Sequence, residues 1–194
     1  MTIGSLPGVV DLWDRFASFR YSLFRLEVLQ VYGGSGEDET LAAFRAGEPI
    51  PLSPALRKWT QMLRQRVSSG CTVQRVHVIT SPVSDYIRFE LASYAPNVEA
   101  GEDVRIIPTP SGGPWPADVP RDDFWLIDSS ELWSQRYDQE GTWLGVERVT
   151  DTGQIVTACR ARDAALHHSR PWADYLRDSH PEITSYLATT ADQS

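Results

Sequence analysis

The apolar and polar positions in the middle of the chain alternate between a helical and an extended period. Residues 56–69 carry one apolar stripe, which predicts an amphipathic helix, and residues 72–79 form a β-branched run that is typical of a buried strand. The alternation continues with a helix at 84–95 and strands at 103–107 and 124–128. Helices that alternate with strands predict an α/β fold in which a mixed sheet is flanked by helices.

Patterned segments also lie on both sides of this region. The apolar spacing of residues 9–24 predicts an N-terminal helical segment, and from residue 22 the pattern becomes that of a strand, in which Phe24, Leu26 and Val28 share one face. The remaining predicted elements are a short helix at 40–46, strands at 131–137 and 143–149, and a closing helix at 154–169.

Turn-forming residues divide these elements. Ser53-Pro54 is a cap followed by a first-turn proline, and we expect Ser81-Pro82 to begin the next helix in the same way. The proline- and glycine-rich segment 109–121 is predicted to be a loop that is mobile until Trp115 docks.

The expected domain organisation is simple. Residues 1–10 are predicted to be a flexible arm, 11–170 a single α/β domain and 171–194 a C-terminal tail. Within that tail, Trp172, Tyr175 and Leu176 are the side chains expected to dock.

Composition excludes several classes of protein. The net charge of −8 disfavours direct nucleic-acid binding, because phosphate contacts need a basic face. No apolar run approaches the roughly 20 residues of a membrane span, and the first residues lack the pattern of a signal peptide. Cys71 and Cys159 lie far apart in the sequence and are expected to be reduced thiols. We therefore expect a cytoplasmic protein without membrane contact.

Most candidates for metal binding or catalysis have a simpler interpretation. Asp122, Asp123 and Asp128 resemble a divalent-cation site, although such groups more often mark a solvated strand entrance. The adjacent histidines 167 and 168 point about 100° apart on a helix, so they are poorly placed to share one ion with a third histidine, His180. His77 is expected to be a core histidine. We expect no metal, no cofactor and no catalytic residue.

The charged residue Glu90 lies inside the apolar arc of the helix expected at 84–95. A charged carboxylate that faces the core needs a partner, because burying it alone is costly. Arg25 is one candidate, since it lies on a strand whose other face is apolar, and Arg162 is another, since small and apolar residues bracket it. A buried ion pair between Glu90 and one of these arginines is therefore predicted, with a ligand site as the alternative.

Four segments of the chain, Phe24-Arg25-Leu26-Glu27, Tyr86-Ile87-Arg88-Phe89-Glu90, Glu99-Ala100-Gly101-Glu102 and Asp123-Phe124-Trp125-Leu126-Ile127-Asp128, carry a resemblance to a known family. They are similar to short actinobacterial proteins of unknown function that are often encoded beside helix-turn-helix regulators of the Xre type. The resemblance implies an accessory role near a transcription switch.

A second resemblance is to the phospholipase-D-like fold. Gly70 and Arg75 stand where that fold enters its first strand, and Asp128 stands at the last position of its His-x-Lys-x4-Asp motif. Arg121 and Asp123 then occupy the histidine and lysine positions. Because the nucleophile and the phosphate-binding cation are both absent, the resemblance implies a shared fold without phosphodiester chemistry.

Three functions are consistent with these observations. The leading hypothesis is a non-catalytic regulatory protein that binds a DNA-binding regulator through an acidic and aromatic surface. The alternatives are a small-ligand-binding protein or enzyme, with its site at the carboxyl ends of the strands near Ile79, Ile107 and Asp128, and a toxin–antitoxin component. Homo-oligomerisation stays open. The candidate ligand- or partner-binding residues are Arg25, Glu27, Arg88, Glu90, Trp115, Asp123, Trp125, Asp128 and Arg162.

Overall fold

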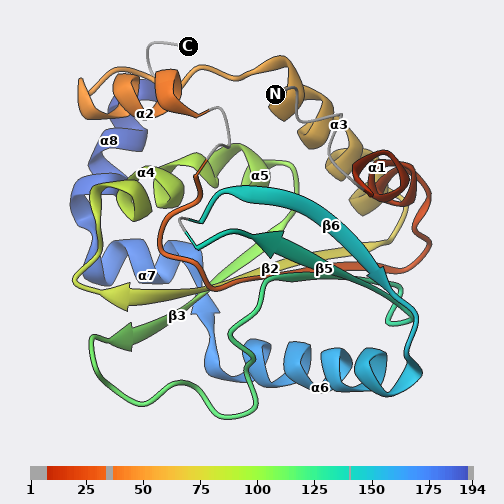
Figure 1. Ribbon diagram of the computed structural model, residues 1–194. Helices are drawn as coiled ribbons and strands as arrows, with labels where there is room; N and C mark the ends of the chain where they lie inside the picture. The colour runs from red at the N-terminus through yellow and green to blue at the C-terminus, as the bar shows by residue number, and fades with distance from the viewer. Residues whose placement is uncertain (1–7, 34–36, 140, 192–194) are drawn as a thin grey trace.

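A computed structural model describes residues 8–33, 37–139 and 141–191 and contains one seven-stranded sheet with helices on both faces (Figure 1). The strand order is β6-β5-β4-β1-β2-β3-β7. The strands are β1 Ser22–Glu27, β2 Thr72–Ser81, β3 Asp103–Pro110, β4 Phe124–Ile127, β5 Glu131–Tyr137, β6 Trp143–Val149 and β7 Arg170–Pro171. Strands β1, β2 and β3 are parallel, whereas the other four pair antiparallel with their neighbours. The predicted α/β class, a mixed sheet flanked by helices, is confirmed.

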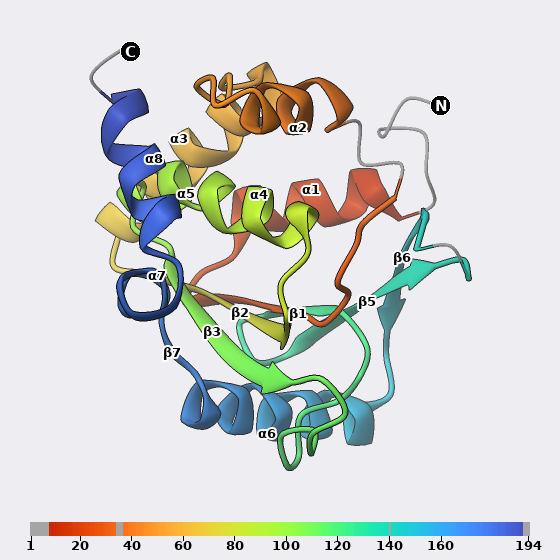
Figure 2. The same cartoon turned by 90° about the vertical axis from the view of Figure 1, so that its left-hand side faces the viewer.

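The helices are divided unequally between the two faces of the sheet (Figure 2). Helix α6 lies along one face, and the other described helices gather on the opposite face and beside its β3 edge (Figures 1 and 2). The helices are α1 Val9–Ser18, α2 Asp38–Arg45, α3 Pro54–Ser68, α4 Asp85–Ser93, α5 Ala95–Glu99, α6 Thr152–His168, α7 Trp172–Ser179 and α8 Pro181–Ala191. No helix in these described ranges combines the length and the apolar character that a membrane span needs.

Strand β1 shows how the two faces differ. Successive side chains point to opposite faces of a sheet, so Phe24 and Leu26 pack toward α6 whereas Leu23 packs beneath α1 and α3. The face toward α6 is apolar along this strand. On the other face, Leu23 is followed by Arg25 and Glu27, and both charged side chains are buried. The centre of that face is therefore polar.

Most predicted elements agree with the structure, and the disagreements have local causes. Strands β5 and β6 have the predicted bounds, and Ser53 caps α3 by accepting a hydrogen bond from the Leu56 amide at 3.1 Å. The expected helix start at Ser81-Pro82 is wrong, because β2 runs to Ser81 and Ser84 caps α4 instead. The expected helix at 84–95 is two helices, α4 and α5. The division falls just before Pro96, which has no N–H to donate to the carbonyl four residues earlier and therefore cannot continue α4, although it suits the first turn of α5.

The C-terminal region is more ordered than the predicted tail. Helices α7 and α8 occupy much of it, and Trp172, Tyr175 and Leu176 are buried together with Ile106 of β3. The Trp172 indole donates a hydrogen bond to the Leu91 carbonyl at 2.8 Å, which joins α7 to α4. These side chains dock as predicted. Residues 1–7 of the expected arm lie outside the described ranges.

The proline- and glycine-rich loop between β3 and β4 is held to the domain by Trp115. Its indole donates a hydrogen bond to the Val119 carbonyl at 2.7 Å, and the Arg121 guanidinium lies 4.2 Å from its ring centroid. The ring packs against the apolar core beside α6. Trp115 is therefore docked on the side of the sheet that α6 covers.

Asp128 joins the end of β4 to the start of β1. Its carboxylate accepts hydrogen bonds from the backbone amides of Arg20, Tyr21 and Ser22, at 2.7 Å for Tyr21 and 2.9 Å for the other two. Burial alone would raise the pKa of Asp128, but these backbone hydrogen bonds hold it below its usual value. The structure therefore gives Asp128 the role of a backbone anchor.

Replacing Asp128 should therefore destabilise the fold. We expect Asp128→Ala to lower the free energy of unfolding by about 1–3 kcal/mol, because three amides lose their acceptor. Asp128→Asn should recover part of that loss, since its amide oxygen still accepts and asparagine tolerates the positive φ of 51° found here. Chemical denaturation measures both, with the exposed Asp122→Ala as the control. Equal losses at positions 122 and 128 would contradict this role.

Candidate functional site

The polar centre of the sheet is built from β1 and β2. In their parallel register Arg25 lies beside Arg75 and Glu27 lies beside His77, and all four side chains face away from α6. They separate two apolar cores on that face, one beneath α1 and α3 and the other beneath α4 and α7. Each of the four residues is at most 9% exposed. Burying ionisable groups is unfavourable unless each charge lies close to a group of opposite charge or to a hydrogen-bond partner.

Five of the buried ionisable side chains form a row in which the sign of the charge alternates: Asp123, Arg25, Glu27, Arg75 and Glu102. Arg25 donates to Asp123 at 2.9 Å and to Glu27 at 3.3 Å. Arg75 donates to both oxygens of Glu27 at 2.8 Å and to Glu102 at 2.9 Å. Burial opposes the charge on Glu27, but Arg75 and Arg25 outweigh it and lower the pKa of Glu27 to about 2. We call this group the charged row.

Asp123 closes the row at the entrance of β4. Besides Arg25, it accepts hydrogen bonds from the Val28 amide at 2.8 Å and from the hydroxyls of Tyr32 and Tyr137 at 2.8 and 3.1 Å. The carboxylate of Asp123 therefore has a structural role, since it joins β1, β4, β5 and the segment after β1. The alternative cation site of Asp122, Asp123 and Asp128 is wrong, because the anchor role of Asp128 places it at the opposite end of β4.

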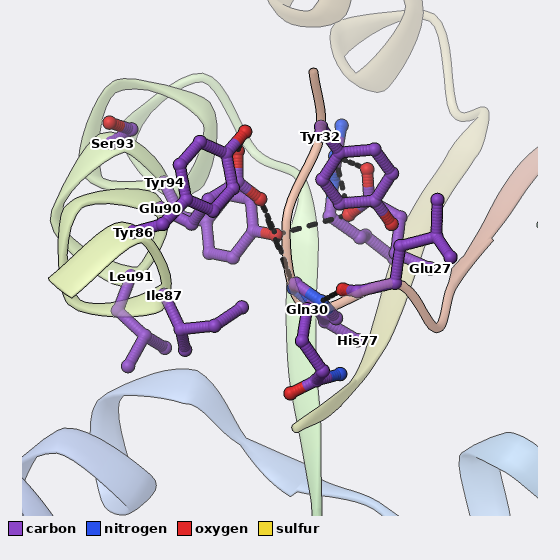
Figure 3. Close-up of polar contacts among 12 residues, drawn as sticks. Glu27, Gln30, Tyr32, His77, Tyr86, Ile87, Glu90, Leu91, Ser93 and Tyr94 are labelled. Atoms are coloured by element: carbon purple, nitrogen blue, oxygen red, sulfur yellow. Dashed lines mark hydrogen bonds and ion pairs between the residues drawn. The ribbon is translucent and has the colours of Figure 1, made fainter. Parts of the chain in front are cut away.

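The hydroxyl of Tyr94 lies among three acceptors at the centre of the polar face (Figure 3). Its oxygen is 2.8 Å from Nδ1 of His77, 3.1 Å from Glu27 and 3.2 Å from Glu90. Nε2 of His77 lies 3.0 Å from the Leu29 carbonyl, which can only accept, so Nε2 carries the hydrogen. Burial lowers the pKa of His77, so the ring is neutral, and Nδ1, Glu27 and Glu90 are three acceptors for the single hydroxyl hydrogen of Tyr94.

Glu90 is consequently the group that needs a proton of its own. Burial, followed by the charges of Glu27 and Glu37, raises the pKa of Glu90 to about 8. Its other oxygen lies 3.2 Å from the Tyr86 hydroxyl, which also contacts Glu37 at 3.0 Å. As a neutral acid, Glu90 avoids repulsion from Glu27 and does not need the Tyr94 hydrogen for its own charge. The site therefore holds a protonated carboxyl group near neutral pH.

The predicted ion pair of Glu90 with Arg25 or Arg162 is wrong. Glu90 does face inward, but its hydrogen-bond partners are Tyr86 and Tyr94, which lie four residues before and after it on the same helix. Arg162 belongs to α6 on the other face, where it contacts Asp163 and Ser129. The sequence signal for these hydrogen bonds was the presence of tyrosines four residues before and four residues after Glu90.

Two adjoining pockets open above the charged row. They have volumes of about 340 and 440 Å³ and share Trp13, Phe16, Glu37, Arg75, Glu90 and Trp125 in their walls. The first also contacts Arg25 and the second Asn97. Nη1 of Arg25 and Oδ1 of Asn97 are buried and have no hydrogen-bond partner in the described part of the chain. Each pocket therefore has in its wall a residue with one buried polar atom that lacks a partner within the described ranges.

A larger pocket of about 900 Å³ lies on the other face, between α6 and the segment that precedes β4. Its wall is mostly apolar, and its charged side chains Asp118, Asp122 and Arg160 are exposed. Only Asp123 is shared with the charged row, and its oxygens are already bonded. Buried ionisable groups with altered pKa values are the better indicator of a functional site, so we place the site above the charged row.

The structure brings five of the nine candidate residues together, with Arg25, Glu27 and Asp123 in the charged row and Glu90 and Trp125 beside it. The other four lie elsewhere: Arg88 is exposed and pairs with Glu182, while Trp115, Asp128 and Arg162 have the positions described above. Four further members of the site, Arg75, Tyr86, Tyr94 and Glu102, were not predicted from the sequence, and His77 was expected to be a core histidine.

The alternative site near Ile79, Ile107 and Asp128 is wrong in its geometry. Strand β4 is antiparallel to β1, so Asp128 lies at the amino end of β1, away from the carboxyl ends of β2 and β3. Ile79 and Ile107 are buried in different cores, on opposite faces of the sheet. The ends that do contribute are the carboxyl end of β1, with Glu27, and the entrance of β4, with Asp123.

Comparison with known proteins places the chain in a family. The sequence profile of a family described as a domain of unknown function (DUF6879) matches residues 10–177. The chain belongs to that family. The charged row, Glu90 and both tyrosines that contact it lie within the DUF6879 match. No curated protein matches the chain.

The two arginines once considered as partners of Glu90 should differ in their effect on stability. We expect Arg25→Ala to cost about 3–5 kcal/mol of unfolding free energy, because it leaves Asp123 and Glu27 buried without one of their cations. Arg162→Ala should cost about 1 kcal/mol or less, because its ion-pair partner Asp163 is exposed. Urea denaturation of both variants checks this. A small loss for Arg25→Ala would contradict the importance of the charged row.

Glu90 should make the protein less stable as the pH rises. Its folded pKa of about 8 lies above the ordinary 4.5, so the stabilisation is complete below about pH 4.5 and is lost as the pH rises through about 8. By linkage the loss is roughly 4–5 kcal/mol. Glu90→Gln keeps the shape without the titration, so denaturation curves of this variant should lack that loss. The exposed Glu99→Gln is the matched control, and an unchanged pH slope in Glu90→Gln would refute the assignment.

Proposed function

We propose that this protein binds a small molecule in the two pockets above the charged row. The observation that carries the proposal is the composition of the pocket walls, which combine aromatic rings with Glu90 and Arg75 and include two residues, Arg25 and Asn97, that each hold a buried polar atom without a partner among the described residues. Burying a polar atom without a partner costs about 1–3 kcal/mol, and a bound molecule can supply the missing partner. The two atoms, Arg25 Nη1 and Asn97 Oδ1, have almost no accessible surface, so their side chains would turn toward a ligand that offers an acceptor to the first and a donor to the second.

The size and lining of the pockets support the same function. Volumes of about 340 and 440 Å³ are ordinary for small-molecule sites, which combine apolar walls with a few polar groups. The walls are largely aromatic, and edge-to-face contacts join Trp125 to Phe16 and Trp59. A rigid aromatic wall and a fixed charged floor are preorganised, which reduces the ordering cost of binding.

Ligand binding is compatible with the regulatory role that the resemblance implies. In that role the protein is a cytoplasmic accessory factor whose complex with a helix-turn-helix regulator responds to the bound molecule. The partnership and the location stay predictions, as do the toxin–antitoxin alternative, homo-oligomerisation and the phospholipase-D-like relationship. The acidic composition supports a protein partner over nucleic acid.

Blocking one pocket should abolish binding without unfolding the protein. Ser93 of α4 lines the second pocket, whereas Ser68 of α3 is exposed, and each hydroxyl donates to a carbonyl of its own helix. We expect some compounds of a metabolite library to raise the melting temperatures of the wild-type protein and of the Ser68→Phe variant. The same compounds should not change the melting temperature of the Ser93→Phe variant. A ligand at 100 times its dissociation constant stabilises by about 2.7 kcal/mol.

Two results would count against the proposed function. One is a library in which no compound shifts the melting temperature of the wild-type protein. The other is a set of shifts that persist unchanged in Ser93→Phe, which would place the binding site elsewhere on the molecule.

A further inference from the structure

We infer that the molecule bound above the charged row is a small organic cation, a protonated amine with an apolar body, whose charge takes the place of the proton on Glu90. This inference rests on the proposed function, because it specifies the ligand of the same pockets. It follows from the charge balance of the buried groups, the chemistry of the pocket walls and the surroundings of Glu90.

The buried groups carry more carboxylates than cations. The charged row contains three carboxylates and two guanidinium groups, and Glu90 adds a fourth carboxyl group beside it. Among the described residues, the cations that hydrogen-bond to the carboxylates of the row are Arg25 and Arg75, and neither bonds to Glu90, whose partners are Tyr86 and Tyr94. With Glu90 ionised the excess is two negative charges. A proton on Glu90 removes one of them, and a bound monocation can do the same.

The walls around Glu90 are suited to an organic cation. Both pockets include Trp13, Phe16 and Trp125, and aromatic rings attract positive charge: Lys58 already lies 5.7 Å from the Trp13 ring centroid and Arg25 lies 5.0 Å from that of Trp125. Tyr86 and Tyr94 contact the carboxyl group directly. The two arginines already donate to carboxylates of the charged row, so their charges are locally balanced. An anionic ligand would add to the negative excess. A neutral ligand would leave the proton in place.

The groups that face Glu90 come from every neighbouring element. Glu27 of β1 and Glu37 before α2 oppose its ionisation, while Arg75 of β2 and the Tyr94 hydroxyl favour it. His77 of β2 lies 4.0 Å away and is neutral. A cation bound beside Glu90 would also favour the ionisation of Glu90. The exchange is balanced: the ammonium group binds, Glu90 becomes a carboxylate and one proton leaves to water.

A metal ion is the competing cation. Donor atoms of Glu27, His77 and Glu90 lie within 4.8 Å of one another, a spacing that an ion could bridge after a small closure. The Tyr94 oxygen, however, lies between them at 2.8–3.2 Å from each, where the ion would have to sit. An organic cation in the pocket leaves this hydroxyl in place, which favours the amine.

Three molecules of nearly the same shape test the sign of the ligand's charge. Benzylamine, benzyl alcohol and benzoate differ mainly in being cationic, neutral and anionic. We expect benzylamine to quench the tryptophan fluorescence of the pocket and to raise the melting temperature. Benzyl alcohol and benzoate should bind at least about tenfold more weakly, because they lack the ionic hydrogen bond to Glu90. Manganese and zinc chlorides form the metal arm, and phenethylamine and tryptamine test larger bodies.

Proton release tests the role of Glu90. Calorimetry in two buffers of different ionisation enthalpy should show about one proton released per amine bound near pH 6.5, with affinity rising about tenfold per pH unit until Glu90 ionises on its own. Glu90→Gln should lose the release and bind at least about tenfold more weakly near pH 7. Glu99→Gln, the same substitution on the exposed surface of α5, should behave as the wild-type protein.

The possible failures can be told apart. If benzyl alcohol or benzoate binds as well as benzylamine, and Ser93→Phe blocks it, the pocket is real and the cation inference is wrong. If a metal ion binds and none of the three amines does, the Glu27, His77 and Glu90 group is a metal site and the inference is also wrong. If neither the probes nor the library shifts the wild-type protein, the proposed function itself fails.

Discussion

The burial of charge on one face of the sheet is the constraint on which the rest of this structure depends. An isolated ion inside a protein costs several kcal/mol, so each charge of the charged row needs neighbours of opposite sign at hydrogen-bond distance. Arg75 satisfies this by bonding both oxygens of Glu27 and one of Glu102. The positions of α5, which precedes Glu102, and of β4, which follows Asp123, are thereby tied to the centre of the sheet.

The same constraint explains why two apolar cores share one face. Buried ion pairs are weak contributors to stability when they are compared with apolar side chains of similar volume. The cores beneath α1 and α3 and beneath α4 and α7 supply the hydrophobic stabilisation of this face. The charged row between them contributes little hydrophobic stabilisation. A polar strip retained at that cost is more easily understood as a functional feature than as a stabilising one.

The sequence allowed most of the fold to be predicted, because the fold depends on local periodicity. The bounds of β5 and β6 followed from alternation, and α3 followed from its apolar stripe and its Ser53 cap. The site was only partly predictable. Helical geometry placed Glu90 toward the interior, but it cannot say which strand lies opposite or in which direction that strand runs. Strand direction decided the outcome, since the antiparallel course of β4 brought Asp123 to Arg25 and carried Asp128 to the far end.

The composition of the charged row also has a consequence for how the chain folds. Its charges come from β1, β2, the start of β3 and the start of β4, and only Arg25 and Glu27 are close in sequence. A partly assembled sheet would dehydrate some of these ions before their partners arrive, which is unfavourable at each intermediate stage. Long-range pairings of this kind slow folding and make it cooperative. A sheet with the wrong strand order would leave at least one of these ions without its counterpart, so the ionic centre favours the native strand order over the alternatives.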